Sequence, residues 1–151
     1  MKDISHRTTN IVLADDDEDD YLFLKSAAEQ SASPVSITHV LNWLELLRRV
    51  SRTPLPDIIF LDLNMPVKNG LECLELLRAE EKYDNISIII YSTSRSRKDI
   101  DEAHRLGANY YVVKPSSQEE ITRLIEKICN MNKETLLAKP EKENFLLATG
   151  G

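Results

Sequence analysis

The sequence has few cysteines, no excess of basic residues and no long hydrophobic run, and each absence excludes a class of protein. Only two of the 151 residues are cysteines, Cys73 and Cys129. Neither belongs to a C-x-x-C pair or to a Cys/His cluster with metal-ligand spacing. We therefore expect two reduced thiols on helices and no cysteine-based metal site.

Charge and hydropathy argue against a nucleic-acid-binding protein and against a membrane protein. The formal net charge is −6, which gives no basic field to displace counterions from a nucleic acid, so we expect no nucleic-acid partner. The N-terminal stretch MKDISHRTTN has no apolar signal core, and no run approaches the ~18 apolar residues needed to span a bilayer. The expectation is a cytoplasmic protein that does not bind membranes.

Short apolar runs alternate with longer helical patterns along the chain. Three of the runs are almost continuously apolar, which is typical of parallel strands buried on both faces. The predicted strands are Asn10–Ala14, Val35–Val40, Asp57–Leu61, Ser87–Tyr91 and Tyr110–Val113. The predicted helices are Glu18–Gln30, Trp43–Val50, Leu71–Glu80, Lys98–Leu106 and Gln118–Met131. Together these elements form five βα units, and a doubly wound α/β domain is the expected fold.

The last predicted helix carries both a start signal and a buried face. Ser117 and Glu120 have the spacing of a capping box at its first turn. Its apolar residues recur at i, i+3, i+4 and i+7, which predicts one stripe facing a sheet. These residues are Ile121, Leu124, Ile125 and Ile128.

Polar residues follow four of the five predicted strands. Asp15 and Asp16 follow the first, Asp62 the third, Ser92 and Thr93 the fourth, and Lys114 and Pro115 the fifth. In doubly wound sheets, ligands bind at the carboxyl ends of the strands. These side chains are therefore expected to converge on one edge of the sheet.

The three aspartates at that edge predict a bound cation. Carboxylates ~4 Å apart repel one another by roughly 4 kcal/mol per pair at an effective dielectric constant near 20. A ligand set made only of oxygen atoms, with room for water and a phosphate, suits Mg²⁺ better than a full Ca²⁺ cage. Flanked by Mg²⁺ and the Lys114 ammonium, Asp62 is predicted to attack phosphorus and become an acyl phosphate.

Four stretches of sequence carry a family resemblance. IVLADDDEDD, IIFLDLNMPVKNG, IIIYSTS and ANYYVVKP closely resemble the receiver domain of two-component response regulators, over about residues 10 to 131. Their fixed order, each at a strand end, is more specific than any one motif. The resemblance implies a flavodoxin-like sheet with strand order 2-1-3-4-5. It also implies a bacterial phosphoprotein that receives its phosphoryl group from a sensor histidine kinase in a phosphorelay.

The resemblance also assigns a role to each site residue by its position. Asp62 would be the phosphoacceptor. Asp16 would bind Mg²⁺ directly, Asp15 through water, and Asn64 through its main-chain carbonyl. Ser92 would hydrogen-bond a phosphoryl oxygen, and Lys114 would pair with one.

Three further positions match the family pattern, and one departs from it. Thr93 stands beside the phosphoryl site, at a position that relatives often fill with a small residue. Gly70 matches the glycine after the phosphoacceptor loop. Tyr111 matches an aromatic switch residue. The peptide bond before Pro115 is expected to be cis.

Each assignment has a simpler alternative. Glu18, Asp19 and Asp20 are interpreted as acidic residues favoured at a helix N-terminus by the macrodipole. Tyr111 has the alternative of a half-buried strand aromatic. Trp43 stands at a predicted helix start, either in the core or as an exposed contact.

Two other functional classes fit part of the pattern. A haloacid-dehalogenase-type phosphatase also uses an aspartyl phosphate and Mg²⁺, but it needs a second Asp two positions after its nucleophile, where this chain has Asn64. A flavodoxin-like FMN carrier needs a phosphate-binding loop after the first strand, where DDDEDD would repel the flavin phosphate.

The sequence therefore predicts a stand-alone receiver domain that is a switch rather than an enzyme, beyond its own phosphotransfer and dephosphorylation. Residues 1–9 are expected to form an N-terminal extension, and residues 132–151 a flexible tail with FLLA as a possible docking segment. We expect an unidentified downstream protein, or a second copy of the chain, to bind the face formed by the fourth helix, fifth strand and fifth helix. The charged residues expected there are Arg97, Lys98, Asp101, Glu102 and Arg105.

Overall fold

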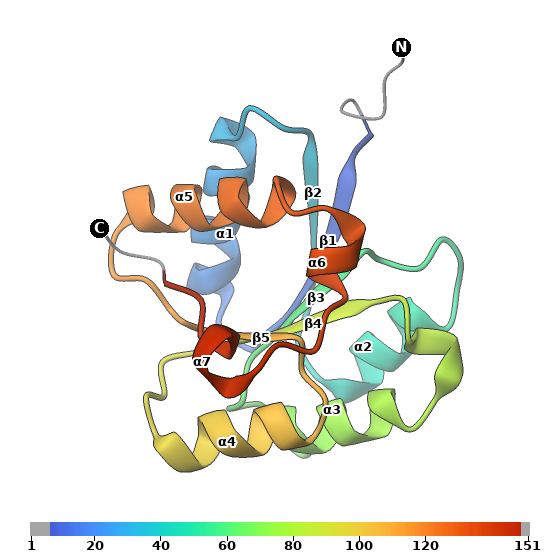
Figure 1. Cartoon of the computed structure of the whole chain (residues 1–151). Coiled ribbons are helices and arrows are strands. Elements are labelled where there is room, and N and C mark those ends of the chain that lie inside the picture. Colours follow the sequence, from blue (N-terminus) through green and yellow to red (C-terminus); the bar gives the residue numbers. More distant parts are fainter. Residues whose placement is uncertain (1–6, 149–151) are drawn as a thin grey trace.

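A computed structural model describes residues 7–148, and its centre is one sheet of five parallel strands (Figure 1). The strands are β1 (Thr9–Ala14), β2 (Val35–Val40), β3 (Ile58–Leu61), β4 (Ser87–Ser92) and β5 (Tyr110–Val113). Their order across the sheet is β2-β1-β3-β4-β5, which confirms the expected flavodoxin-like topology.

Helices cover both faces of this sheet. They are α1 (Glu18–Gln30), α2 (Trp43–Val50), α3 (Gly70–Arg78), α4 (Arg97–Arg105) and α5 (Gln118–Cys129), with a short 3-10 turn, η2 (Glu81–Tyr83). Side chains alternate between the two faces along each strand. Ile11 and Leu13 of β1 lie in the core under α1 and α5, whereas Val12 and Ala14 lie in the core under α2, α3 and α4. Both faces of the sheet are therefore buried, as the continuous apolar runs predicted.

Short polar caps fix where the helices begin. Asn69 and Glu72 form a full capping box at α3, since the Asn69 side chain accepts from the backbone N–H of Glu72 and the Glu72 carboxylate accepts from that of Asn69. The capping box predicted for α5 is only half formed. Ser117 accepts from the Glu120 N–H, but the Glu120 carboxylate lies nearest the N–H and hydroxyl of Ser116, one residue earlier.

Trp43 begins α2 and is partly buried against the core under α2, α3 and α4, so it lies between the two alternatives, a core residue and an exposed contact. Within residues 7–148, no helix combines the length and apolar character needed to cross a bilayer.

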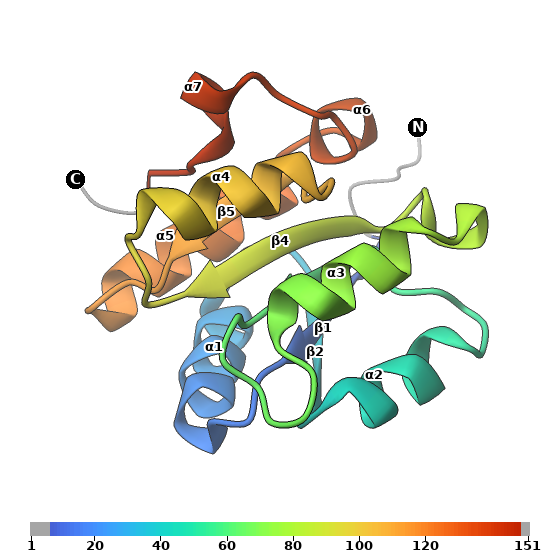
Figure 2. The ribbon, with the colours of Figure 1, turned by 90° about the horizontal axis from the view of Figure 1, so that it is seen from below.

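Residues 132–148, here called the C-terminal arm, are folded against the domain, which corrects the expectation of a flexible tail for this part of residues 132–151; residues 149–151 lie outside the described residues. The arm contains two short helices, α6 (Lys133–Leu136) and α7 (Lys142–Phe145), and runs beside α4 and β5 (Figure 2). Leu146 forms a parallel bridge with Tyr111, and the Leu147 N–H donates to the Tyr111 carbonyl at 2.9 Å. The arm thus continues the sheet at the free edge of β5.

Apolar and polar contacts both hold the arm in place. Phe145 is fully buried, with its ring edge-on to the His104 ring at 4.9 Å between centroids. The Asn109 amide donates to the Ala138 carbonyl, and the Tyr110 hydroxyl donates to the Thr135 carbonyl. The FLLA segment does dock, as the sequence suggested was possible, but it docks onto its own domain.

One partly buried guanidinium links the arm to the rest of the fold. Arg78 at the end of α3 donates to the carbonyls of Gly107, Tyr83 and Ile86. It also donates at 2.7 Å to the side-chain oxygen of Asn109, whose amide nitrogen reaches the arm. Arg78 and Asn109 therefore form a continuous polar connection from α3 to residue 138.

Replacing Phe145 with alanine should release the arm while the domain stays folded. The buried ring is the arm's main apolar anchor, and Phe→Ala substitutions at buried sites cost about 3 kcal/mol or more. We expect much faster hydrogen exchange at the Leu147 amide, measured by NMR. Leu146→Ala is the matched control because its side chain is 46% exposed, and it should leave this exchange rate nearly unchanged. Equal exchange rates in both variants would contradict the anchoring role.

Candidate functional site

Sheet register brings the predicted acidic residues together. Ala14 of β1 pairs with Leu61 of β3, so Asp15 and Asp62 leave adjacent strands at the same level. The carboxylates of Asp15, Asp16 and Asp62 each offer an oxygen within 4.8 Å of the others. Asp15 and Asp62 are buried, whereas Asp16 is exposed. Because the cluster is buried on the side of Asp15 and Asp62 and open to solvent at Asp16, it suits a hard cation that keeps some of its water ligands.

Burial makes the charged forms of these carboxylates costly. Desolvation raises the pKa of Asp15 to about 7, even though the Asp17 N–H and the Lys114 ammonium stabilise its anion. Desolvation also raises the pKa of Asp62, against the lowering effects of Lys114 and of a hydrogen bond from the Asn64 backbone. Asp16 adds a repulsive charge that raises the pKa of Asp62 further. A divalent cation would relieve each of these penalties.

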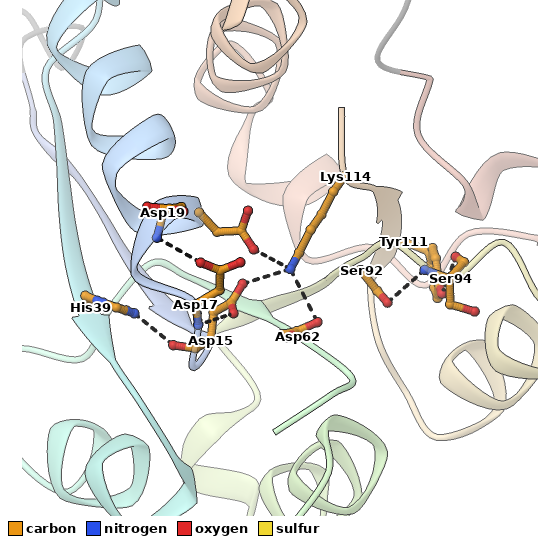
Figure 3. A network of polar contacts seen from close by, with 10 residues as sticks. Asp15, Asp17, Asp19, His39, Asp62, Ser92, Ser94, Tyr111 and Lys114 are labelled. Atoms are coloured by element: carbon orange, nitrogen blue, oxygen red, sulfur yellow. Dashed lines mark hydrogen bonds and ion pairs between the residues drawn. The ribbon is translucent and has the colours of Figure 1, made fainter. Parts of the chain in front are cut away.

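Lys114 lies among these carboxylates (Figure 3). Its Nζ is 3.0 Å from Asp15 Oδ2 and 3.6 Å from Asp62 Oδ1. Burial acts to lower the pKa of Lys114, but its acidic neighbours outweigh burial, so the pKa is raised above the usual lysine value. The Lys114 backbone N–H also donates to the Ser92 carbonyl at 2.8 Å, which ties the ends of β4 and β5 together.

A fourth carboxylate, Asp20, takes part in the site although the sequence analysis interpreted it as ordinary helix N-terminal charge. Its Oδ2 lies 2.6 Å from Lys114 Nζ, closer than either Asp15 or Asp62. One sequence signal could have found it. Asp20 precedes the buried Leu24 by four residues, so it lies on the inward face of α1.

Gly70 is required by a close approach of two backbone segments. A Cβ atom at this position would lie 2.2 Å from the carbonyl oxygen of Asp62. The Gly70 N–H donates to the Leu63 carbonyl at 3.0 Å, which folds the loop after β3 back on itself. Any side chain here would displace the backbone of the candidate phosphoacceptor.

Ser92 and Tyr111 both hydrogen-bond the backbone of Ser94. Ser92 is fully buried, and its hydroxyl oxygen accepts from the Ser94 N–H at 3.1 Å. The Tyr111 hydroxyl donates to the Ser94 carbonyl at 2.9 Å (Figure 3). Tyr111 is fully buried rather than half-buried, and its ring centroid lies 6.2 Å from that of Phe145 in the arm.

Three other predicted site residues have different outcomes. Asn64 and Thr93 are exposed, and the proposed roles of the Asn64 carbonyl and of Thr93 stay predictions. The expected cis peptide before Pro115 is wrong. Among residues 7–148, the single cis peptide joins Thr53 and Pro54, and the Lys114–Pro115 bond has the trans form that X-Pro peptides favour by about 0.5–1 kcal/mol.

Comparison with known proteins places this geometry in context. The family model of the response regulator receiver domain matches residues 11–126. A chemotaxis protein CheY homolog of Campylobacter jejuni is 34% identical over 71 residues, which are 47% of this chain and 55% of that protein. The nitrate/nitrite response regulator protein NarL of Escherichia coli is 39% identical over 72 residues, 48% of this chain and 32% of NarL. The matched segments thus span about half or less of these relatives.

Solved structures agree in fold. The response regulator RPA3017 in red light signaling of R. palustris is 30% identical, with a TM-score of 0.72 over 79% of this chain and 90% of that one. The phosphorylated cyanobacterial phytochrome response regulator RcpA is 24% identical, with a TM-score of 0.73 over 89% of this chain and 97% of that one. At this lower identity, the likeness to RcpA supports the fold alone.

The match favours a receiver over both alternative classes considered from the sequence, a dehalogenase-type phosphatase and an FMN carrier. It covers the four motifs that end at the carboxyl edge of the sheet, from Asp15 through Lys114. This chain belongs to the response regulator receiver domain family.

Proposed function

We propose that this protein accepts a phosphoryl group on Asp62 from a sensor histidine kinase in a Mg²⁺-dependent reaction, and that phosphorylation switches a protein-interaction surface. The observation that carries this proposal is the position of Asp62. Its buried carboxylate belongs to the cluster of three carboxylates that could hold a metal ion, and it lies 3.6 Å from the Lys114 ammonium. A nucleophile flanked by two positive charges is suited to phosphoryl transfer.

The acidic cluster supplies the ligands for the ion. Asp15, Asp16, Asp62 and the carbonyl of Asn64 would hold Mg²⁺ on the exposed side of the cluster. When bound, the ion neutralises charge on the oxygens of the transferring phosphoryl group.

Other residues then complete the transfer. An Asp62 carboxylate oxygen attacks phosphorus, a P–O bond forms, and the P–N bond to the donor histidine breaks with its electron pair leaving on the histidine nitrogen. Lys114 pairs with a phosphoryl oxygen. The Ser92 hydroxyl, whose oxygen accepts from the Ser94 N–H, would donate its proton to another phosphoryl oxygen.

The signal would leave the site through Tyr111. The Ser92 hydroxyl accepts a hydrogen bond from the Ser94 N–H, and the Tyr111 hydroxyl donates one to the Ser94 carbonyl. Movement of the β4–α4 loop toward a phosphoryl group would therefore change the contacts of the Tyr111 hydroxyl. Tyr111 also pairs with the arm through its backbone. The proposed output surface is therefore formed by α4, β5, α5 and the arm, for a downstream protein or a second copy of the chain.

Asp62→Asn should abolish labelling by acetyl phosphate in Mg²⁺, because the amide nitrogen and oxygen lack the charge of the attacking carboxylate. Asp17→Asn is the matched control, since it removes one charge nearby and keeps the cap on α1. Intact-mass measurement should show one added phosphoryl group in the parent and control and none in Asp62→Asn. Undiminished labelling of Asp62→Asn at another residue would refute the assignment.

Asp16→Asn should weaken Mg²⁺ binding by about tenfold or more, because it removes one of the few anionic ligands of the ion. Isothermal titration calorimetry measures the affinity directly. Asp17→Asn again controls for the loss of one negative charge from the same loop and should bind Mg²⁺ nearly as the parent does. Equal affinities for parent and Asp16→Asn would remove Asp16 from the ligand set.

Beryllofluoride, which mimics the phosphoryl group, should change amide exchange beyond the loops around Asp62. We expect altered protection in residues 92 to 113 and in the arm, because Ser94 and Tyr111 connect these segments. Sedimentation of the same samples would reveal any change in association. Changes confined to the loops around Asp62, with unaltered mass, would reject this output route even if Asp62 is phosphorylated.

A further inference from the structure

The shortest contact of the Lys114 ammonium is with a residue that has no part in the phosphotransfer proposed above. Asp20 Oδ2 lies 2.6 Å from Lys114 Nζ, whereas the phosphoacceptor Asp62 lies at 3.6 Å. The ion pair is largely shielded, with the Asp20 side chain 21% exposed and that of Lys114 12% exposed. Asp20 is also separate from the three carboxylates spaced to hold an ion together.

This geometry makes Asp20 and a phosphoryl group compete for one cation. An ammonium has three donors, and two of them already point at Asp20 and Asp15. A phosphoryl group on Asp62 adds anionic oxygens beyond the present 3.6 Å contact between Lys114 Nζ and Asp62 Oδ1, and an ammonium that moves toward them lengthens its bond to Asp20. The Asp20 carboxylate stays behind, partly buried and with its partner withdrawn, which has a free-energy cost.

We infer that Asp20 is a positioning residue: it holds the Lys114 ammonium away from Asp62 in the unphosphorylated protein and so sets how tightly the site retains a phosphoryl group. This inference rests on the proposed function of Asp62. In this inference Lys114 stabilises the phosphorylated state, whereas Asp20 destabilises it. The site is thereby biased toward the unphosphorylated form.

Asp20→Asn tests the inference with little change in shape. The amide keeps the size of the side chain but loses the charge that holds Lys114. Asp19→Asn is the matched control, because Asp19 lies beside Asp20 in the first turn of α1 with an exposed side chain. Both variants remove one negative charge from the same turn, so a long-range effect of net charge would appear in both.

The first measurement needs no phosphoryl group or metal. In lysine-labelled protein, the ¹⁵N and ¹H signals of the Lys114 ammonium report its ion pair directly. Asp20→Asn should shift these signals and speed their exchange with water, whereas Asp19→Asn should not. Unchanged Lys114 signals in Asp20→Asn would overturn the proposed hold on the ammonium.

The second measurement is the affinity for beryllofluoride in saturating Mg²⁺. Since partly exposed ion pairs are worth about 1 kcal/mol, Asp20→Asn should bind roughly three- to tenfold more tightly than the parent, and Asp19→Asn within about twofold of it. Equal or weaker binding by Asp20→Asn would overturn the inference. If the parent itself fails to bind beryllofluoride, the proposed function fails instead, and the two failures are distinct.

A double-mutant cycle separates competition for Lys114 from simple repulsion between Asp20 and the phosphoryl group. Lys114→Met keeps the apolar stem and removes the ammonium. In that background, Asp20→Asn should no longer tighten beryllofluoride binding, because there is no cation left to release. A gain of the same size with and without the ammonium would show that Asp20 acts by repulsion alone, and the positioning role would be wrong.

Discussion

The balance of charge around one ammonium is the constraint on which the site depends. Two carboxylates, those of Asp15 and Asp62, are buried at the end of a sheet whose strands are apolar on both faces. Burial alone would drive them toward the neutral form, as the raised pKa of both shows. Lys114 stabilises negative charge in this position, and its contacts to Asp15, Asp20 and Asp62 determine how much of its positive charge is left for a phosphoryl group. The negative charge that Lys114 does not balance on these carboxylates is what would attract a metal ion.

The fold makes that crowding unavoidable. Parallel strands with the order β2-β1-β3-β4-β5 bring the residues after β1, β3, β4 and β5 to one edge, and the Ala14–Leu61 register sets Asp15 beside Asp62. The close approach at Gly70 then fixes the loop that follows Asp62. Strand order and one glycine thus position the carboxylates that follow the strands. Asp20 comes instead from the first turn of α1.

Local signals in the sequence were enough for the strands, the main helices and the residues at the strand ends, because each depends on nearby periodicity or on position after a strand. Two of the features that were missed, the role of Asp20 and the docked arm, depend on contacts distant in sequence. Asp20 becomes important only through Lys114, which lies 94 residues away. The position of the arm depends on Phe145 packing beside His104 and Tyr111. No pattern within residues 132–151 predicts that contact. The trans bond before Pro115 shows that family resemblance does not decide every local conformation.

The arm changes what a signal from Asp62 would have to move. Tyr111 is enclosed on one side by the loop after β4, through Ser94, and on the other by the arm, through Phe145 and Leu146. A side chain with no exposed surface can change its position only if one of these neighbours yields. The β4–α4 loop is the neighbour that a phosphoryl group would pull, and the arm is the neighbour with an exposed outer side. Any displacement of Tyr111 would therefore be transmitted to the arm, so the proposed output surface includes the arm as well as α4, β5 and α5.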